Sequence, residues 1–244
     1  MKARFTGLTW ENAAHTIATI SLQPDHPYFF TAGQYADVTV AHDSTDNRGT
    51  TRTMTLSSSP SEKAVRFTTC LSEKNSSTYK RALLNLAPGN QVTITDAMGD
   101  MVLPLNESVP LVFVAGGVGI ASYVSMVRWL AEQDDRRDIT LLYTVRNTGD
   151  IIFQETFDAY RSVGNLRTVL YTTDNKVASA DWNGQVEMSR LTSTDIASCL
   201  QPSSQVYLSG TESMVEQFRK ELERDFGVAQ YRIVYDYFEG YTDL

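Results

Sequence analysis

The sequence predicts two domains, an antiparallel β-barrel followed by an α/β domain built on a parallel sheet. Two observations predict this order. The first hundred residues contain several short, alternating, Thr- and Val-rich segments separated by turn clusters, whereas strands alternate with helices after about residue 110. The pattern of apolar residues changes over residues 103–110. We therefore place the domains at residues 1–106 and 107–244.

The barrel strands are expected where polar and apolar residues alternate over four to eight positions. These segments are residues 16–22, 34–40, 52–58, 64–70 and 91–95. The turn clusters QPDHP, HDSTDNRG and APGN lie between them. One helix is predicted over residues 76–86, because Ser76 and Ser77 provide a cap signal before a Leu-rich segment.

The second half predicts right-handed strand–helix–strand crossovers. Strands are expected at residues 111–115, 139–145, 166–173, 205–210 and 232–238, and helices at residues 121–133, 153–163 and 212–226. Residues 174–190 fit no regular element and are expected to form a long surface connection.

Composition excludes several functional classes. The 244 residues carry a formal net charge of −8, which disfavours non-specific binding to nucleic acid or anionic lipid. The N-terminus lacks the apolar region of a signal peptide, and the longest apolar run, residues 111–121, is too short and Gly-rich to span a bilayer. A cytoplasmic protein without membrane insertion is therefore expected.

Metal and hydrolase chemistry are not indicated. Cys70 and Cys199 are too few for a zinc site, a Cys-ligated iron–sulfur cluster or a disulfide framework. The sequence has neither a metal-ligand spacing nor a nucleophile-elbow serine. The three histidines lie in the barrel half, away from the motifs, and are expected to be structural: His15, His26 and His42.

A Gly-rich turn follows the first strand of the predicted α/β domain. Gly116, Gly117 and Gly119 stand between residues 111–115 and a helix, where backbone N–H groups can meet phosphate oxygens. Ser122 takes the position of the third glycine in the dinucleotide fingerprint. Ligand binding is favoured over a simple connection because of the place of the turn in the domain.

Arg146 ends the next strand, where nucleotide folds often place an acidic residue for a ribose hydroxyl. An arginine there suits a 2′-phosphate, although a solvated loop arginine is an equally good interpretation. Asp150 lies nearby and could serve the ribose instead.

The stretch TRTMTLSSS, residues 51–59, combines one arginine with many hydroxyls. Arg52 can grip a diphosphate through its planar fork, and Thr53 and Thr55 add donors and acceptors. Taken alone, a solvated Thr-rich strand is the better interpretation. Serine and threonine residues also stand at positions 76–78, at the start of a predicted helix, and they favour the interpretation as a phosphate-binding site.

Two more segments lie at predicted carboxyl ends of parallel strands. Ser209 and Gly210 form another strand-to-helix turn, where ligands collect in such folds. The tail holds Phe238, Glu239 and Tyr241, which could either complete the core or cover a flat ring.

In this order, the motifs resemble those of the ferredoxin–NADP⁺ reductase superfamily over nearly the whole chain. The family's Arg-x-Tyr-Ser/Thr motif is matched by Arg52-Thr53-Met54-Thr55, with Met54 in place of the tyrosine. Its Gly-Gly-x-Gly-Ile-Thr-Pro motif is matched by residues 116–122, and its Cys-Gly-Pro by Ser209-Gly210-Thr211. The stretch Asn75–Lys80 and the tail resemble further family segments.

The resemblance implies a barrel that binds FAD and an α/β domain that binds NADPH or NADH. Arg52 would neutralise the FAD diphosphate, helped by Ser76, Ser77 and Thr78, and Thr55 would bond the flavin at N5. For the catalytic and cofactor-binding roles near the meeting of nicotinamide and flavin, it implies Ser209 and Glu239, with Phe238 or Tyr241 shielding the ring.

The leading hypothesis is therefore a flavin-dependent oxidoreductase that takes hydride from NAD(P)H. The acceptor would be a protein, such as a ferredoxin, a flavodoxin or an oxygenase-type partner, or a small diffusible molecule. The substitutions at Met54, Ala121, Ser122 and Ser209 keep a second hypothesis open, a flavin-binding electron-transfer or regulatory subunit with little intrinsic NAD(P)H activity.

Overall fold

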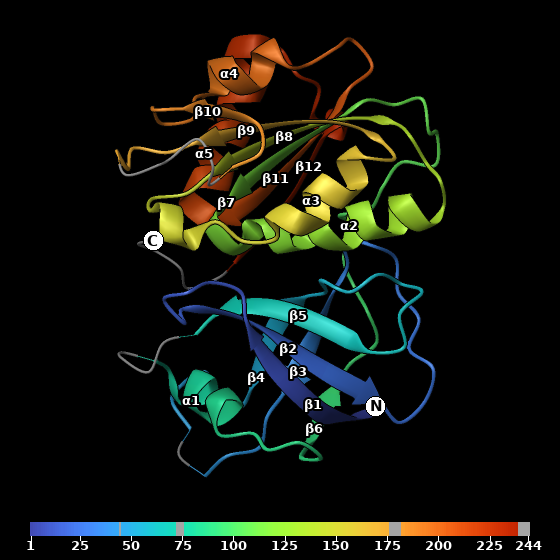
Figure 1. Ribbon diagram of the computed structural model, residues 1–244, viewed down its shortest axis with the longest axis vertical. Helices are drawn as coiled ribbons and strands as arrows, with labels where there is room; N and C mark the ends of the chain where they lie inside the picture. The colour runs from blue at the N-terminus through green and yellow to red at the C-terminus, as the bar shows by residue number, and fades with distance from the viewer. Residues whose placement is uncertain (44, 72–75, 176–181, 239–244) are drawn as a thin grey trace. The chain divides into compact units, whose positions relative to one another are not determined.

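The protein forms two compact units, Met1–Val102 and Leu103–Leu244, in a computed structural model (Figure 1). The structure describes residues 1–43, 45–71, 76–175 and 182–238. In this part of the chain, no helix combines the length and the apolar character that crossing a membrane requires.

The first unit is a single antiparallel sheet of six strands in the order β4-β3-β6-β1-β2-β5. Its elements are β1 (Lys2–Trp10), β2 (Ile17–Pro24), β3 (Tyr35–Thr39), β4 (Thr51–Thr55), β5 (Val65–Cys70), α1 (Thr78–Leu84) and β6 (Gln91–Ile94). The two outer strands meet, because Leu56 bridges Phe67 and the Ser57 N–H donates to the Arg66 carbonyl at 2.8 Å. This contact closes the sheet and confirms the predicted barrel.

Alternating side chains fill the interior of this barrel. Phe5, Ile20, Leu22 and Phe67 are almost completely buried in one apolar cluster, together with Tyr79 of α1. The sequence interpretation did not include β1, whose alternation is interrupted where the pairing with β2 shifts between Phe5 and Gly7. That irregularity hides the strand from a search for strict period-two patterns.

The second unit is a parallel six-stranded sheet in the order β10-β9-β8-β7-β11-β12, as predicted for the α/β domain. Its strands are β7 (Leu111–Gly116), β8 (Asp138–Thr144), β9 (Asn165–Tyr171), β10 (Gln185–Glu187), β11 (Gln205–Thr211) and β12 (Ile233–Phe238). Its helices are α2 (Ile120–Glu132), α3 (Gln154–Arg161), α4 (Ser193–Ser198) and α5 (Glu212–Phe226).

Helices cover both faces of this sheet. The α2 and α3 helices lie side by side (Figure 1), while residues of α4 and α5 share an apolar cluster with Val112, Val114 and Leu208. Residues of β7 are therefore buried on both faces, which explains why this strand is continuously apolar.

The chain runs outward from β7 in both directions. The strands β8, β9 and β10 follow on one side, and β11 and β12 complete the other side. The order reverses between β7 and β11, and open α/β sheets bind ligands at the carboxyl ends of strands at such a switch point.

Two short elements were not predicted from the sequence. The expectation of no regular structure over residues 174–190 is wrong for β10, whose three residues pair in parallel with β9 at the sheet edge. Such a short edge strand depends on the backbone of β9 and carries no periodicity of its own. The other element, α4, begins at a capping box formed by Thr192 and Asp195.

A buried ion pair holds the turn before β8. The Arg137 guanidinium donates to the Asp135 carboxylate through Nε at 3.0 Å and through Nη2 at 2.5 Å, and both side chains are less than a tenth exposed. Arg137 Nη1 also donates to the Pro104 carbonyl at 3.1 Å. Burial alone would raise the pKa of the Asp135 carboxyl, but the hydrogen bonds and charge of Arg137 outweigh burial and lower it.

We expect Asp135→Asn to lower the free energy of unfolding by about 3–5 kcal/mol at pH 7, because it leaves the Arg137 guanidinium buried and unpaired. Since the folded pKa lies below the unfolded value, the carboxylate contributes stability above about pH 4 and loses it as the pH falls through the folded pKa. Urea unfolding at several pH values should show the two proteins converging in acid.

The adjacent pair Asp134–Arg136 provides the matched control. Both of these side chains are more than two-thirds exposed, so Asp134→Asn should change the unfolding free energy by less than about 1 kcal/mol. Equal losses for the two variants would contradict a specific role for the buried pair.

Candidate functional site

Arg52 lies on β4, in the first unit, opposite Val38 of β3. Its guanidinium donates through Nη1 to three backbone carbonyls, of Arg48 at 2.8 Å, Gly49 at 3.1 Å and Thr51 at 2.6 Å. Through Nη2 it pairs with the Asp46 carboxylate at 3.2 Å. Its side chain is 19% exposed, so the positive charge is held in place at the surface of the barrel.

The Asp46 side chain organises the turn that precedes β4. Its Oδ1 accepts from the Arg48 N–H at 3.0 Å, and the Gly49 N–H donates to the Asp46 carbonyl at 3.0 Å. Partial burial would raise the pKa of the Asp46 carboxyl, but the Arg48 N–H and the charges of Arg48 and Arg52 lower it below its ordinary value. The carboxylate is therefore ionised at neutral pH.

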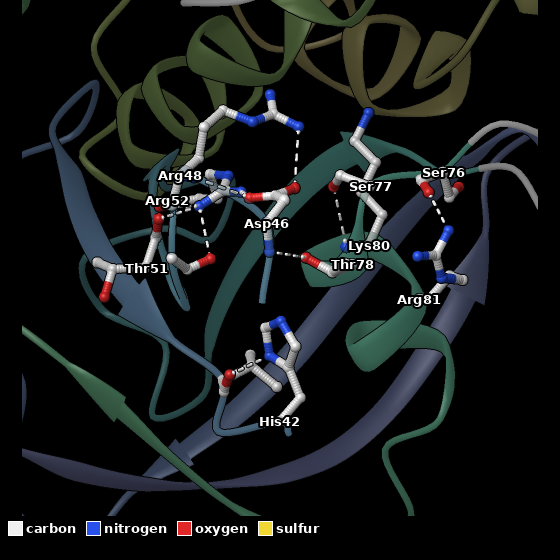
Figure 2. Close-up of polar contacts among 12 residues, drawn as sticks. His42, Asp46, Arg48, Thr51, Arg52, Ser76, Ser77, Thr78, Lys80 and Arg81 are labelled. Atoms are coloured by element: carbon white, nitrogen blue, oxygen red, sulfur yellow. Dashed lines mark hydrogen bonds and ion pairs between the residues drawn. The ribbon is translucent and has the colours of Figure 1, made fainter. Parts of the chain in front are cut away.

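The start of α1 meets this turn, as Figure 2 shows. The Thr78 hydroxyl accepts from the Asp46 N–H at 3.2 Å, and the Ser77 hydroxyl caps α1 by accepting from the Lys80 N–H at 3.3 Å. Arg81 Nη1 donates to the carbonyl of Ser76, which is buried. The fold thus brings the serine and threonine hydroxyls to the turn that holds Arg52.

The Tyr79 ring packs against the Arg52 guanidinium. The guanidinium carbon of Arg52 lies 5.1 Å from the centre of the Tyr79 ring, and the Tyr79 hydroxyl donates to the Val38 carbonyl at 3.0 Å. Burial raises the pKa of the Tyr79 phenol above its ordinary value, so the ring stays neutral and its proton stays on the hydroxyl.

The other residues of the β4 motif lie on both sides of the strand. Met54 is 8% exposed and packs in the barrel core, whereas the Thr53 hydroxyl donates to Asp37 at 2.7 Å in an exposed position. Thr55 is buried and pairs with Tyr35 across the sheet.

A second group of candidate residues lies in the second unit, at the switch point between β7 and β11. The chain leaves β7 through a 3₁₀ turn, Gly117–Gly119, and enters α2 with Gly119 as its N-cap, where no side chain caps the helix. A helix start without a capping side chain leaves backbone N–H groups to meet an anion.

The glycines of this turn are required for different reasons. Gly117 has a φ of +52°, the left-handed region that favours glycine. A Cβ on Gly119 would lie 2.3 Å from the Ser209 carbonyl oxygen, so any side chain there would collide with the β11 backbone. Cβ atoms on Gly116 or Gly210 would meet the Met214 side chain at 2.8 and 2.5 Å.

Ser209 is completely buried at the end of β11. Its hydroxyl lies 3.4 Å from the hydroxyl of Ser122, which is also completely buried in the first turn of α2. The two side chains therefore tie the helix start to β11. Thr211, two residues later, caps α5 by accepting from the Met214 N–H at 3.4 Å.

Arg146 is exposed just beyond the end of β8, and within the described residues its guanidinium makes no hydrogen bond or ion pair. Asp150 accepts from the Asn147 side chain at 3.0 Å. In the same loop, the Thr148 N–H donates to the Asp174 carboxylate at 3.0 Å and ties it to the end of β9.

The tail is described only in part. The Phe238 backbone ends β12, where it pairs with Thr211. Glu239 and Tyr241, the other tail residues that the sequence singled out, lie outside the described residues.

Sequence reasoning missed Asp46 and Arg48, which lie in the turn cluster HDSTDNRG. The signal was available, because an aspartate three residues before a glycine is typical of such turns. Nothing in the local pattern, however, indicates that this turn packs against Arg52 and Thr78.

Comparison with known proteins agrees with this geometry. Residues 113–220 match the family model described as the oxidoreductase NAD-binding domain. The chain is 30% identical over 143 residues to the phenol hydroxylase P5 protein of Acinetobacter pittii, which covers 59% of this chain and 39% of that protein. It is 25% identical over 230 residues to the reductase component of propane 2-monooxygenase from Rhodococcus jostii, covering 91% and 60%.

A solved structure of the same fold is that of a ferredoxin–NADP⁺ reductase from Neisseria gonorrhoeae with bound FAD and NADP. It superposes with a TM-score of 0.78 at 18% identity and covers 97% of this chain and 98% of that one. The matched regions span only 36–43% of the length of several curated relatives, including the flavohemoprotein of Bordetella pertussis.

Residues 113–220 thus match an oxidoreductase NAD-binding domain, and the chain has the two-domain fold of the ferredoxin–NADP⁺ reductase of Neisseria gonorrhoeae.

Proposed function

We propose that the chain is an FAD-dependent NAD(P)H reductase that passes electrons to a protein or a small diffusible acceptor. The observation that carries the proposal is the presence, in one chain, of two anion-suited groups. One is the group on the barrel formed by Arg52 and the hydroxyls of Ser77 and Thr78. The other is the glycine turn at the β7–β11 switch point.

The barrel group fits the diphosphate of FAD. Arg52 supplies a fixed positive charge, Ser77 and Thr78 supply hydroxyls beside it, and Tyr79 supports the guanidinium from below. Charge-assisted contacts between arginine and phosphate are among the stronger polar interactions in proteins. Thr55, three residues along from Arg52, would present its hydroxyl to N5 of the flavin.

The glycine turn fits the diphosphate of NADPH or NADH. Space is open where a side chain of Gly117 would stand, so a ligand can approach the backbone there, and the start of α2 offers N–H donors. Ser209 and Ser122 keep that helix start against β11.

FAD, when bound, would accept hydride from the nicotinamide and pass the electrons on singly or in a pair. The roles of the chain are binding and orientation. Arg52 would compensate the diphosphate charge, Thr55 would hydrogen-bond the ring edge, and the glycine turn would position the second nucleotide.

The test is anaerobic stopped-flow absorbance of the purified, FAD-loaded protein mixed with NADPH or NADH. We expect the absorbance band of the oxidised flavin to disappear during the stopped-flow record. The band should return when an acceptor is added. A protein that takes up no FAD, or whose flavin keeps its absorbance with both cofactors, would refute the proposal.

The burial of Ser209 favours a second candidate, a flavin-binding electron-transfer or regulatory subunit with little NAD(P)H activity. Its hydroxyl is directed to Ser122 and it is completely buried, as expected for a structural residue. This candidate predicts bound flavin that NADPH and NADH leave oxidised, and it is rejected by rapid loss of the flavin band.

Arg146 is proposed to favour NADPH over NADH, since its exposed guanidinium can pair with a 2′-phosphate. Arg146→Ala should lower kcat/KM for NADPH about tenfold, the cost of one exposed charge-assisted contact, and leave the value for NADH unchanged. Arg136→Ala, at an exposed arginine paired with Asp134, is the control. An equal effect on both cofactors would contradict the specificity role.

The electron acceptor is proposed only as a class. The similar proteins include reductase components named for phenol hydroxylase and propane 2-monooxygenase, so an oxygenase-type partner is one candidate, beside a ferredoxin, a flavodoxin or a small molecule. Turnover with each acceptor, measured at equal flavin concentration, would separate them.

A further inference from the structure

The Arg52 fork is not free to receive a diphosphate as it stands. Its Nη1 donates to three carbonyls and its Nη2 to the Asp46 carboxylate, so a carboxylate occupies the edge that an anion would use. The second oxygen of Asp46 pairs with Arg48 Nη2 at 3.4 Å. One carboxylate is thus shared between two arginines.

The position of Asp46 is set by its own turn as well as by these charges. The Arg48 N–H donates to Asp46 Oδ1. The backbone N–H of Asp46 donates to the Thr78 hydroxyl, which is one of the groups assigned to the diphosphate (Figure 2). Asp46 therefore contacts the residues that would contact phosphate oxygens.

We propose that Asp46 is an internal competitor of the diphosphate for Arg48 and Arg52, and that Arg48 is the second cation of the site. This inference rests on the proposed FAD-binding function. It adds a residue that sets the affinity of the site for FAD. With the carboxylate, the three side chains carry one net positive charge, and without it they carry two. Displacement of Asp46 by the ligand therefore lowers the affinity that the two arginines could otherwise provide.

The test is the affinity of the full chain, freed of flavin, for FAD, followed by flavin fluorescence. Asp46→Asn keeps an oxygen to accept from the Arg48 N–H, and asparagine is favoured in such turns, so the backbone is preserved while the charge is lost. We expect Asp46→Asn to bind FAD about fivefold more tightly, a gain that shrinks at 1 M salt. Arg48→Gln should bind FAD more weakly.

Asp43→Asn is the matched control. Asp43 is an exposed carboxylate on the same segment, so the variant changes the net charge equally and should leave the FAD affinity unchanged. Riboflavin, which has no phosphate, should bind the native protein and Asp46→Asn equally. In an Arg52→Gln background, the effect of Asp46→Asn should be reduced, because the two residues act through one contact.

The opposite possibility is that Asp46 orients Arg52 for the ligand. Unchanged or weaker FAD binding by Asp46→Asn, with a thermal unfolding curve like that of the native protein, would then overturn the competitor role and leave the FAD-binding proposal intact. If the native protein binds no FAD, the proposed function fails. Inorganic pyrophosphate then decides the inference: tighter binding by Asp46→Asn supports it, and binding by neither protein overturns it.

Discussion

Arg52→Gln is expected to bind FAD about 100-fold more weakly than the native protein. The glutamine retains polarity but loses the positive charge and the planar fork, and charge-assisted hydrogen bonds contribute about 1.5–3 kcal/mol each in proteins. The measurement is titration of the flavin-free full chain with FAD, followed by flavin fluorescence.

Three comparisons make this result specific. Arg52→Lys keeps the charge without the fork and should fall between the two proteins. Arg4→Gln removes an arginine that is 65% exposed and paired with Asp25, and should bind FAD normally. Because Arg52 also holds the carbonyls of its turn, the thermal unfolding of each variant must be recorded. A native FAD affinity for Arg52→Gln would refute the assigned role.

Gly119→Ala is expected to remove most of the NAD(P)H reactivity while leaving FAD bound to the barrel. The new Cβ would lie 2.3 Å from the Ser209 carbonyl oxygen and 2.6 Å from its carbon, both backbone atoms, so α2 must move away from β11. Such overpacking costs about 1–3 kcal/mol of unfolding free energy. A displacement of the helix start on this scale can lower the rate of flavin reduction about 100-fold.

The control uses the other glycine of the same turn. A Cβ on Gly117 meets nothing within 4 Å, so only its positive φ resists substitution. Gly117→Asn, which tolerates the left-handed region, should leave the unfolding free energy within about 1 kcal/mol of the native value. Gly119→Ala with normal stability and a normal rate of flavin reduction would contradict the close approach of α2 and β11.

The two-domain fold was predictable because its signals are local. Period-two alternation over residues such as Ile17–Leu22 requires only the neighbouring positions, and the run Leu111–Ala115 shows a strand buried on both faces. The signals failed for β1 and β10, since the first contains an irregularity and the second has only three residues that depend on their neighbour.

The candidate residues were predictable as separate groups. Arg52, the hydroxyls of residues 76–78 and the glycines of residues 116–119 can be found by residue type and position in a predicted element. That Gly119 approaches Ser209, 90 positions later, follows from the parallel pairing of β7 with β11, and no pattern in the sequence reports that pairing.

The amino-acid sequence by itself determined the order of the two domains, the elements that carry the motifs, and the residue types suited to an anionic ligand, because periodicity, turn residues and charge are local properties. Only the tertiary structure decided which groups meet. It placed Met54 in the barrel core, directed Ser209 to Ser122, and set the Asp46 carboxylate on Arg52. The physical reason is that these contacts depend on strand register and on chain segments packed from a distance.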